Sequence, residues 1–139
     1  MGPLGSGYAA KLINNLIVGG EITLIAEAFG LARRAGVDLT RLMEALSGGA
    51  AASPVLTMKG SKKINGDYTA SSRVLIHLKD QHNAQEMARA LGADIPACDL
   101  STLLLEKLAD MGRGNEDVAA VIDLFQSKVD LRRLWNGNL

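Results

Sequence analysis

The chain has few of the residues that cross-link or stiffen small secreted and β-rich folds. It contains one cysteine, Cys98, which excludes an internal disulfide and fits a reducing, cytoplasmic compartment. Only three prolines occur in 139 residues, and no β-rich run of alternating apolar and polar residues is present, which argues against a β fold. Cys98 lies among apolar positions after Pro96, so we expect a buried packing residue rather than a nucleophile.

The chain also lacks an excess of either charge. Fifteen basic and fifteen acidic residues give a formal net charge of zero, so neither nucleic acid nor an anionic membrane is expected as its main partner. No signal peptide is visible. The most apolar stretch, residues 12–32, carries Asn14, Asn15, Glu21 and Glu27, so we expect no clean transmembrane span.

Metal ligation is not expected either. The two histidines, His77 and His82, are five residues apart, and neither has a cysteine or another histidine at a ligand spacing. Helix packing or solvent contact is the favoured interpretation of both, so the sequence predicts no metal site.

What remains is helical periodicity, which predicts an all-α fold: a helical bundle around one long N-terminal helix. That first helix is expected from about Tyr8 to Ala35, apolar on nearly every side. Its Gly19-Gly20 pair costs roughly 2 kcal/mol relative to alanine, which close packing of another helix would offset. The expected starts of the later helices are Asp38, Ser53-Pro54, Ser71 or Ser72, Pro96 and Asn115.

The segment from Gly5 to Asn15 carries the clearest chemical signal. Lys11 and Asn15 are four residues apart, so both side chains share one face of the first helix. A cation beside a neutral amide, on an apolar background, suits a small oxyanion or carbonyl. Residues 5–10 also fit the dinucleotide pattern G-x-G-x-x-G/A, but only residues 1–4 precede them, where a strand is required. A flexible approach to the helix is therefore favoured over a phosphate-binding loop.

The pattern Gly5-x-Gly7-x-x-x-Lys11-x-x-x-Asn15 resembles the catalytic segment of the β-hydroxyacid dehydrogenases. This family includes 3-hydroxyisobutyrate dehydrogenase, tartronate semialdehyde (2-hydroxy-3-oxopropionate) reductase and the glyoxylate/succinic semialdehyde reductases. The resemblance runs from Gly2 to about Phe125 and concerns the C-terminal helical domain, which is similar to the C-terminal domain of 6-phosphogluconate dehydrogenase. Further similar segments are Ala26-Glu27-Ala28, residues 35–38, residues 48–56, which look most like the tartronate semialdehyde reductase branch, and residues 75–80.

The resemblance implies roles for individual residues. Lys11 is expected to be the catalytic general acid/base, with Asn15, Gly5 and Gly7 binding the substrate. Lys79 and Asp80 are expected at the cofactor, NAD or NADP, with Asp80 as an orienting residue. No metal is implied. The substrate is expected to be a small hydroxy acid or semialdehyde, such as tartronate semialdehyde.

The resemblance also implies a domain plan. Residues 1–7 are expected to be the remnant of an interdomain hinge, residues 8–128 the helical substrate-binding and dimerisation domain, and residues 129–139 a C-terminal tail. The family's N-terminal Rossmann domain, which holds NAD(P), is missing, so we expect this chain alone to be inactive. A homodimer or higher homo-oligomer in the cytoplasm is expected.

Two alternatives remain open. One is an imine reductase-type relative, although those enzymes usually carry another residue in place of Lys11. The other is a non-catalytic helical oligomerisation module, which the apolar first helix supports in part. 6-Phosphogluconate is not expected as the substrate, because Arg113, Arg132 and Arg133 are scattered and form no phosphate-binding cluster.

Overall fold

The computed structural model describes residues 5–127 and 130–136, and these residues form helices and no strand. The prediction of an all-α fold around one long N-terminal helix is confirmed. The helices are α1 (Ser6–Arg34), α2 (Leu39–Ser47), α3 (Pro54–Asn65), α4 (Val74–Leu91), α5 (Pro96–Asp110), the 3-10 helix η1 (Val118–Val121), α6 (Ile122–Gln126) and α7 (Arg132–Trp135).

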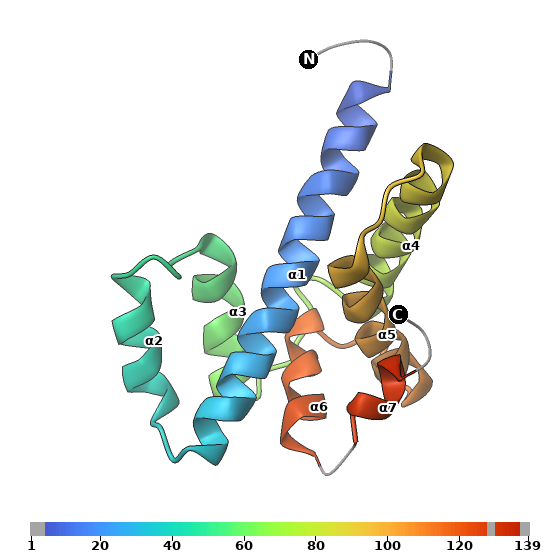
Figure 1. Ribbon diagram of the computed structural model, residues 1–139. Helices are drawn as coiled ribbons and strands as arrows, with labels where there is room; N and C mark the ends of the chain where they lie inside the picture. The colour runs from blue at the N-terminus through green and yellow to red at the C-terminus, as the bar shows by residue number, and fades with distance from the viewer. Residues whose placement is uncertain (1–4, 128–129, 137–139) are drawn as a thin grey trace.

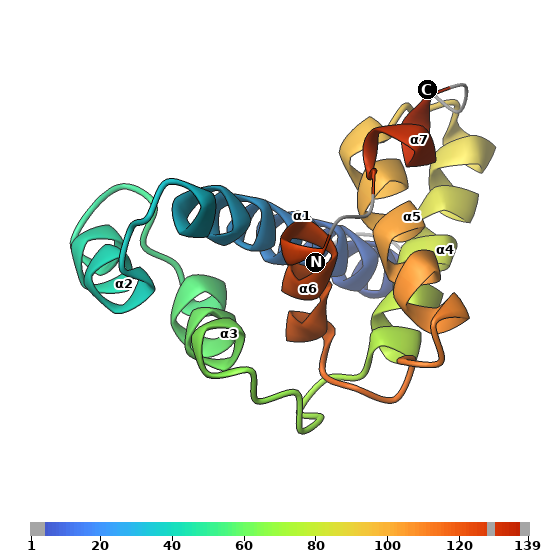
Figure 2. The same ribbon diagram turned by 90° about the horizontal axis from the view of Figure 1, so that it is seen from below.

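Helix α1 is the axis of the molecule. In two perpendicular views, α2 and α3 lie on one flank of α1 and the α4–α5 hairpin lies on the other (Figures 1 and 2). Helices α3, α4, α5 and α6 all contact α1 directly. The first half of α1 extends away from α2 and α3, and its neighbours there are α4 and α5 (Figure 1).

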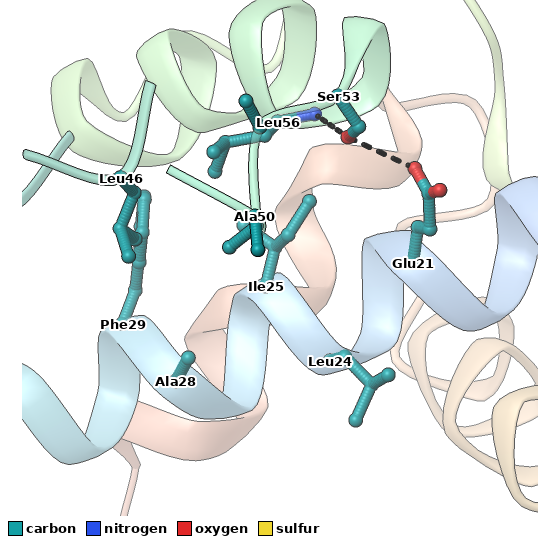
Figure 3. Close-up of a pocket in the computed structure, with 11 residues that line it drawn as sticks. Glu21, Leu24, Ile25, Ala28, Phe29, Leu46, Ala50, Ser53 and Leu56 are labelled. Carbon is teal, nitrogen blue, oxygen red and sulfur yellow. Dashed lines mark hydrogen bonds between the residues drawn. The ribbon is translucent and has the colours of Figure 1, made fainter. Parts of the chain in front are cut away.

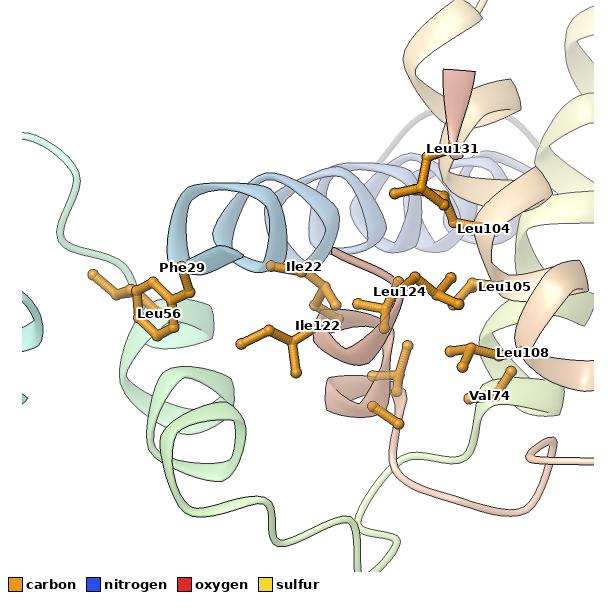
Figure 4. Close-up of a cluster of buried hydrophobic side chains, with 14 of the residues drawn as sticks. Ile22, Phe29, Leu56, Val74, Leu104, Leu105, Leu108, Ile122, Leu124 and Leu131 are labelled. Atoms are coloured by element: carbon orange, nitrogen blue, oxygen red, sulfur yellow. The ribbon is translucent and has the colours of Figure 1, made fainter. Parts of the chain in front are cut away.

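The main core gathers around the middle and second half of α1. Figure 4 shows side chains from α1, α3, α5 and α6 meeting there, among them Ile22, Phe29, Leu56, Leu108 and Ile122. A smaller cluster of Leu12, Ala84 and Cys98 joins the first half of α1 to α4 and α5. Cys98 is buried as expected, and burial raises the pKa of its thiol.

By length and composition, α1 is apolar enough to span a membrane. On that test the expectation of no transmembrane-like stretch is wrong. Asn14, Asn15 and the two glutamates do not lower the mean hydropathy of α1 enough to exclude it. The central helices of soluble proteins meet the same test. In the structure α1 is a core helix, with Leu12, Ile22 and Phe29 buried against other helices.

The helix starts agree with the sequence in part. The carboxylate of Asp38 accepts from the backbone N–H of Arg41, and the hydroxyl of Ser53 accepts from that of Leu56, so both expected caps are confirmed. Helix α1 starts at Ser6, two residues before the expected Tyr8.

Two expected caps are wrong. Arg73, without a side-chain bond, precedes α4, and Asp117 instead of Asn115 caps η1. The reason is the buried Asp117 carboxylate, which accepts from the backbone N–H groups of Ser71, Ser72 and Ala119. The serines therefore hold the loop before α4 rather than starting the helix.

The adjacent glycines Gly19 and Gly20 of α1 differ in their surroundings. A Cβ on Gly19 would collide with the Gln81 side chain of α4 and approach Ser101 of α5, so close packing explains this glycine as expected. A Cβ on Gly20 would meet no atom, so packing within the described residues does not explain the second.

At the other end of the chain, Leu131 is buried in the core and α7 packs on α5, so part of the expected tail is folded.

Candidate active site

Lys11 and Asn15 lie one turn apart near the start of α1. Lys11 is exposed, and Asn15 is partly buried against α4. The Asn15 amide Nδ2 donates a hydrogen bond of 2.8 Å to Asp80 Oδ2. The structure thus joins two of the predicted site residues that are 65 positions apart in the sequence.

Lys79 precedes Asp80 on the same helix and is exposed. Within the described residues neither Lys11 nor Lys79 has a hydrogen bond or an ion pair, so both ammonium groups are free for a ligand. An ammonium group is a point charge with three donors, which suits a developing oxyanion or a phosphate.

The two glycines of the motif occupy different positions. Gly5 precedes α1 with φ of 96°, in the left-handed region that favours glycine. Gly7 is inside the first turn of α1, and a Cβ there would meet nothing within 4 Å. The packing of the described residues does not require Gly7, and it leaves the approach to this end of α1 open.

A second group of charged side chains was not predicted. Lys59 and Lys63 of α3 and Asp117 are buried, with 6%, 1% and 0% of their surface exposed. Lys59 Nζ lies 3.0 Å from both Asp117 oxygens, and Lys63 Nζ donates to the Ala119 carbonyl at 3.4 Å. Leu56, Lys59, Gly60 and Lys63 follow the spacing of one helix face, and this is the sequence signal that could have placed both lysines inside.

The electrostatics of this buried group have identifiable causes. Burial lowers the pKa of Lys63 to about 7, and the attraction of Asp117 opposes the effect without cancelling it. Burial raises the pKa of Asp117, but hydrogen bonds from the Ala119 backbone, Lys59 and Ser71 together hold that pKa well below its usual range. Burial also lowers the pKa of His77, with a further contribution from the Lys59 charge.

Residues 48–53 form a loop whose role the sequence did not define. With α1 and α3, this loop encloses a hollow of about 400 Å³ (Figure 3). Its walls are largely apolar, and Ser53 Oγ donates to Glu21 Oε2 at 3.1 Å at its edge. Glu21 comes ten residues after Lys11, about 15 Å further along α1 at 1.5 Å per residue. The hollow and the Lys11–Asn15 pair are therefore separate features.

The described residues contain no group of three or more histidine, cysteine, aspartate or glutamate side chains placed to hold a metal ion. His82 Nε2 instead lies 3.0 Å from Glu106 Oε1, and His77 is partly buried on the first turn of α4. The polar groups at the start of α1 are thus the free Lys11 ammonium and an Asn15 amide held by Asp80, which suit an oxygen-bearing organic ligand. Lys79 lies on α4 next to Asp80.

Residues 5–125 match the family model described as "NAD-binding of NADP-dependent 3-hydroxyisobutyrate dehydrogenase". The chain is 32% identical over 121 residues to L-threonate dehydrogenase of Escherichia coli K12, covering 87% of this chain and 40% of that enzyme. It is 29% identical over 126 residues to 2-hydroxy-3-oxopropionate reductase of the same organism, covering 91% and 43%. The chain thus spans less than half the length of these relatives.

Solved structures agree. A 3-hydroxyisobutyrate dehydrogenase from Salmonella typhimurium superimposes with a TM-score of 0.83 at 32% identity, covering 86% of this chain and 42% of that one. Mycobacterium tuberculosis 3-hydroxyisobutyrate dehydrogenase with L-serine gives a TM-score of 0.82 at 25% identity, covering 88% and 44%. The matched region runs from Gly5 to Phe125 and contains α1 to η1 and most of α6, and the chain therefore belongs to the β-hydroxyacid dehydrogenase family.

Proposed function

We propose that this chain is the substrate-binding and catalytic-lysine domain of an NAD(P)-dependent β-hydroxyacid dehydrogenase or semialdehyde reductase. The observation that carries the proposal is the start of α1, where an exposed, unpaired Lys11 lies one turn from an Asn15 amide held by Asp80. The substrate class is a small hydroxy acid or semialdehyde. Relatives named for L-threonate and for 2-hydroxy-3-oxopropionate support this class, and tartronate semialdehyde is our leading candidate.

In the proposed reaction, a bound nicotinamide supplies or accepts the hydride. Lys11 Nζ gives or takes the proton at the substrate oxygen and stabilises negative charge that develops there. Asn15 hydrogen-bonds the substrate and fixes its orientation. Gly5 and Gly7 leave room for the substrate beside the backbone.

The donor set on this chain fits only part of a nicotinamide cofactor. Lys79 offers a free ammonium to an anionic group, with Asp80 beside it, but one lysine cannot cradle a dinucleotide. We propose that a Rossmann domain joined through residues 1–7 holds NAD or NADP and that the isolated chain is inactive. A shallow apolar hollow of about 190 Å³ beside the site, lined in part by Leu12, Ile13 and Met87, is a surface that such a domain can cover.

A homodimer or higher homo-oligomer is part of the proposal. Ile13, Ile17, Leu24 and Leu31 are exposed along α1 at spacings of four and seven residues, which place them on one stripe. An apolar stripe of this length is a partner-facing surface rather than a solvent-facing one. Sedimentation equilibrium should give a mass above the monomer's 14.7 kDa, and Ile17→Glu with Leu24→Glu should lower it. A wild-type monomer at high concentration contradicts this part.

The free Lys11 favours alcohol and aldehyde chemistry over imine reduction. The reducing compartment indicated by the single buried thiol of Cys98 supports a cytoplasmic enzyme. An oligomerisation role is compatible with the proposed catalytic role, because the exposed stripe on α1 and the Lys11–Asn15 pair are different surfaces.

The test is a domain graft. Residues 5–139 replace the matching helical domain of 2-hydroxy-3-oxopropionate reductase, and the product is assayed with NAD(P)H and small semialdehydes. Turnover is expected, and Lys11→Ala should lower kcat by about 100-fold or more. Lys107→Ala, in the last turn of α5, is the control and should leave kcat unchanged. A folded graft that turns over no substrate, or full activity in Lys11→Ala, contradicts the proposal.

A further inference from the structure

The Asn15 side chain has two chemically different edges, and the structure holds them in one orientation. Its Nδ2 edge faces α4 and donates to Asp80 Oδ2 at 2.8 Å. Both side chains are partly buried, so water competes less for this bond than at an open surface. The geometry is that of a full-strength hydrogen bond between an amide and a charged acceptor.

The carboxylate of Asp80 decides which way the amide faces. An ionised carboxylate only accepts hydrogen bonds, whereas an asparagine amide has a donor edge and an acceptor edge. Turning the Asn15 amide by 180° would place its carbonyl oxygen against the Asp80 oxygens, which repel it. The observed orientation is therefore set by charge, and a neutral neighbour could not set it as strongly.

The orientation fixes what Asn15 offers to a ligand beside Lys11. One N–H is used by Asp80, which leaves the second N–H and the carbonyl Oδ1. Within the described residues, the only hydrogen bond to Oδ1 comes from Asn14 Nδ2 at 3.4 Å, and this bond is long and exposed. A free N–H and a carbonyl oxygen with a lone pair left for a second bond match a hydroxyl group, which both accepts and donates. A carboxylate or ketone uses only the donor.

We propose that Asp80 is a positioning residue that locks the amide of Asn15 so that it binds a hydroxyl of the substrate next to the reacting centre. The proposal rests on the proposed function, and it gives Asp80 a task beyond its place beside the cofactor-facing Lys79. Because Asp80 acts through Asn15, its loss should matter only while Asn15 is present.

The first experiment uses this chain as it is and needs no activity. In ¹⁵N-labelled protein, the side-chain amide of Asn15 is identified by its loss in Asn15→Ala. One of its protons should be shifted downfield and should exchange slowly with water, because it is bonded to a carboxylate. Asp80→Ala should move both protons to the values of a solvent-exposed amide. Glu86→Ala, an exposed acid on the same helix, is the control and should leave them in place.

The second experiment uses the domain graft and a double-mutant cycle. Asp80→Ala should raise the KM for a hydroxyl-bearing substrate about 10-fold, because the Asn15 amide is no longer held in the orientation that bonds this hydroxyl. It should barely change the KM for an analogue that lacks this hydroxyl. Asn15→Ala and the double variant should have the same KM for the hydroxylated substrate, whereas Glu86→Ala should match the wild type.

The outcomes separate the two proposals. An Asn15 amide that Asp80→Ala leaves unchanged overturns the positioning role, whatever the graft does. Independent, multiplying effects of Asp80→Ala and Asn15→Ala on KM also overturn it. A folded but inactive wild-type graft contradicts the proposed function, while the amide signals still decide whether Asp80 orients Asn15.

Discussion

Two pairs of lysines in this molecule have opposite surroundings. Lys59 and Lys63 are buried on α3, where Asp117 and a backbone carbonyl accept from their ammonium groups. Lys11 and Lys79 are exposed at the start of α1 and on α4, without a partner among the described residues. The first pair is part of the packed fold, and we propose that the second binds a ligand. Each pair should therefore respond to a different measurement.

The largest stability effect is expected from Asp117→Ala. This change leaves the buried Lys59 ammonium without its counter-charge and removes the acceptor of three backbone N–H groups. We expect a loss of about 3–5 kcal/mol in the free energy of unfolding, measured by urea denaturation followed by circular dichroism. Asp67→Ala is the control, because its carboxylate is exposed to solvent, which screens its pair with Lys62, and the loss should be much smaller. Equal losses of stability in Asp117→Ala and Asp67→Ala would contradict the structural role of the buried Lys59–Asp117 pair.

The second effect concerns pH. Burial lowers the pKa of Lys63 from 10.5 to about 7 in the folded chain, where Asp117, Lys59 and Asp123 are the charges that act on it. Between these values the unfolded chain binds the additional proton, so stability must rise with pH. The contribution is absent below about pH 7 and grows as pH increases towards 10.

Urea titrations at pH 7, 8 and 9 measure this dependence. The free energy of unfolding should increase by up to about 1.4 kcal/mol per pH unit, and Lys63→Met should remove the increase. Lys62→Met, at the neighbouring position where the lysine is only partly buried, should retain it. A wild-type protein whose stability is flat over this range would show that Lys63 does not titrate in the folded state as its burial requires.

The smallest stability effect belongs to the exposed pair. Lys11→Met and Lys79→Met remove charges that contact nothing in the described chain, so the free energy of unfolding should change by less than about 0.5 kcal/mol. Thermal and urea denaturation of both variants test this. A loss above about 2 kcal/mol in either variant would mean that the lysine holds the fold rather than a ligand.

The sequence predicted the elements whose causes are local. Helical periodicity and the glycines at helix ends placed the helices, and Asp38 and Ser53 showed their caps directly. Lys11 and Asn15 were placed on one face by their spacing alone. Asp117 was missed in favour of Asn115 because its preference for the cap depends on Ser71, Ser72 and Lys59, which only the tertiary fold brings to it.

Partners distant in the sequence could not be predicted from spacing. The bond between Asn15 and Asp80 requires α1 and α4 to be adjacent, and no local pattern encodes that adjacency. The Gly19-Gly20 pair of α1 gives the same lesson. Gly19 and Gly20 look identical in the sequence, but only Gly19 faces Gln81 and Ser101. Residue types indicated which chemical groups are present, but the packing of the helices determines which of those groups contact each other.

Chemical rescue tests the proposed role of Lys11 most directly. In the domain graft, Lys11→Ala is assayed with increasing concentrations of a small amine such as ethylamine, which can occupy the space of the missing ammonium. We predict that turnover falls by about 100-fold or more and recovers in proportion to the amine concentration, because the amine carries the proton. Near wild-type turnover of Lys11→Ala without any amine would contradict the assignment of Lys11 as the general acid/base.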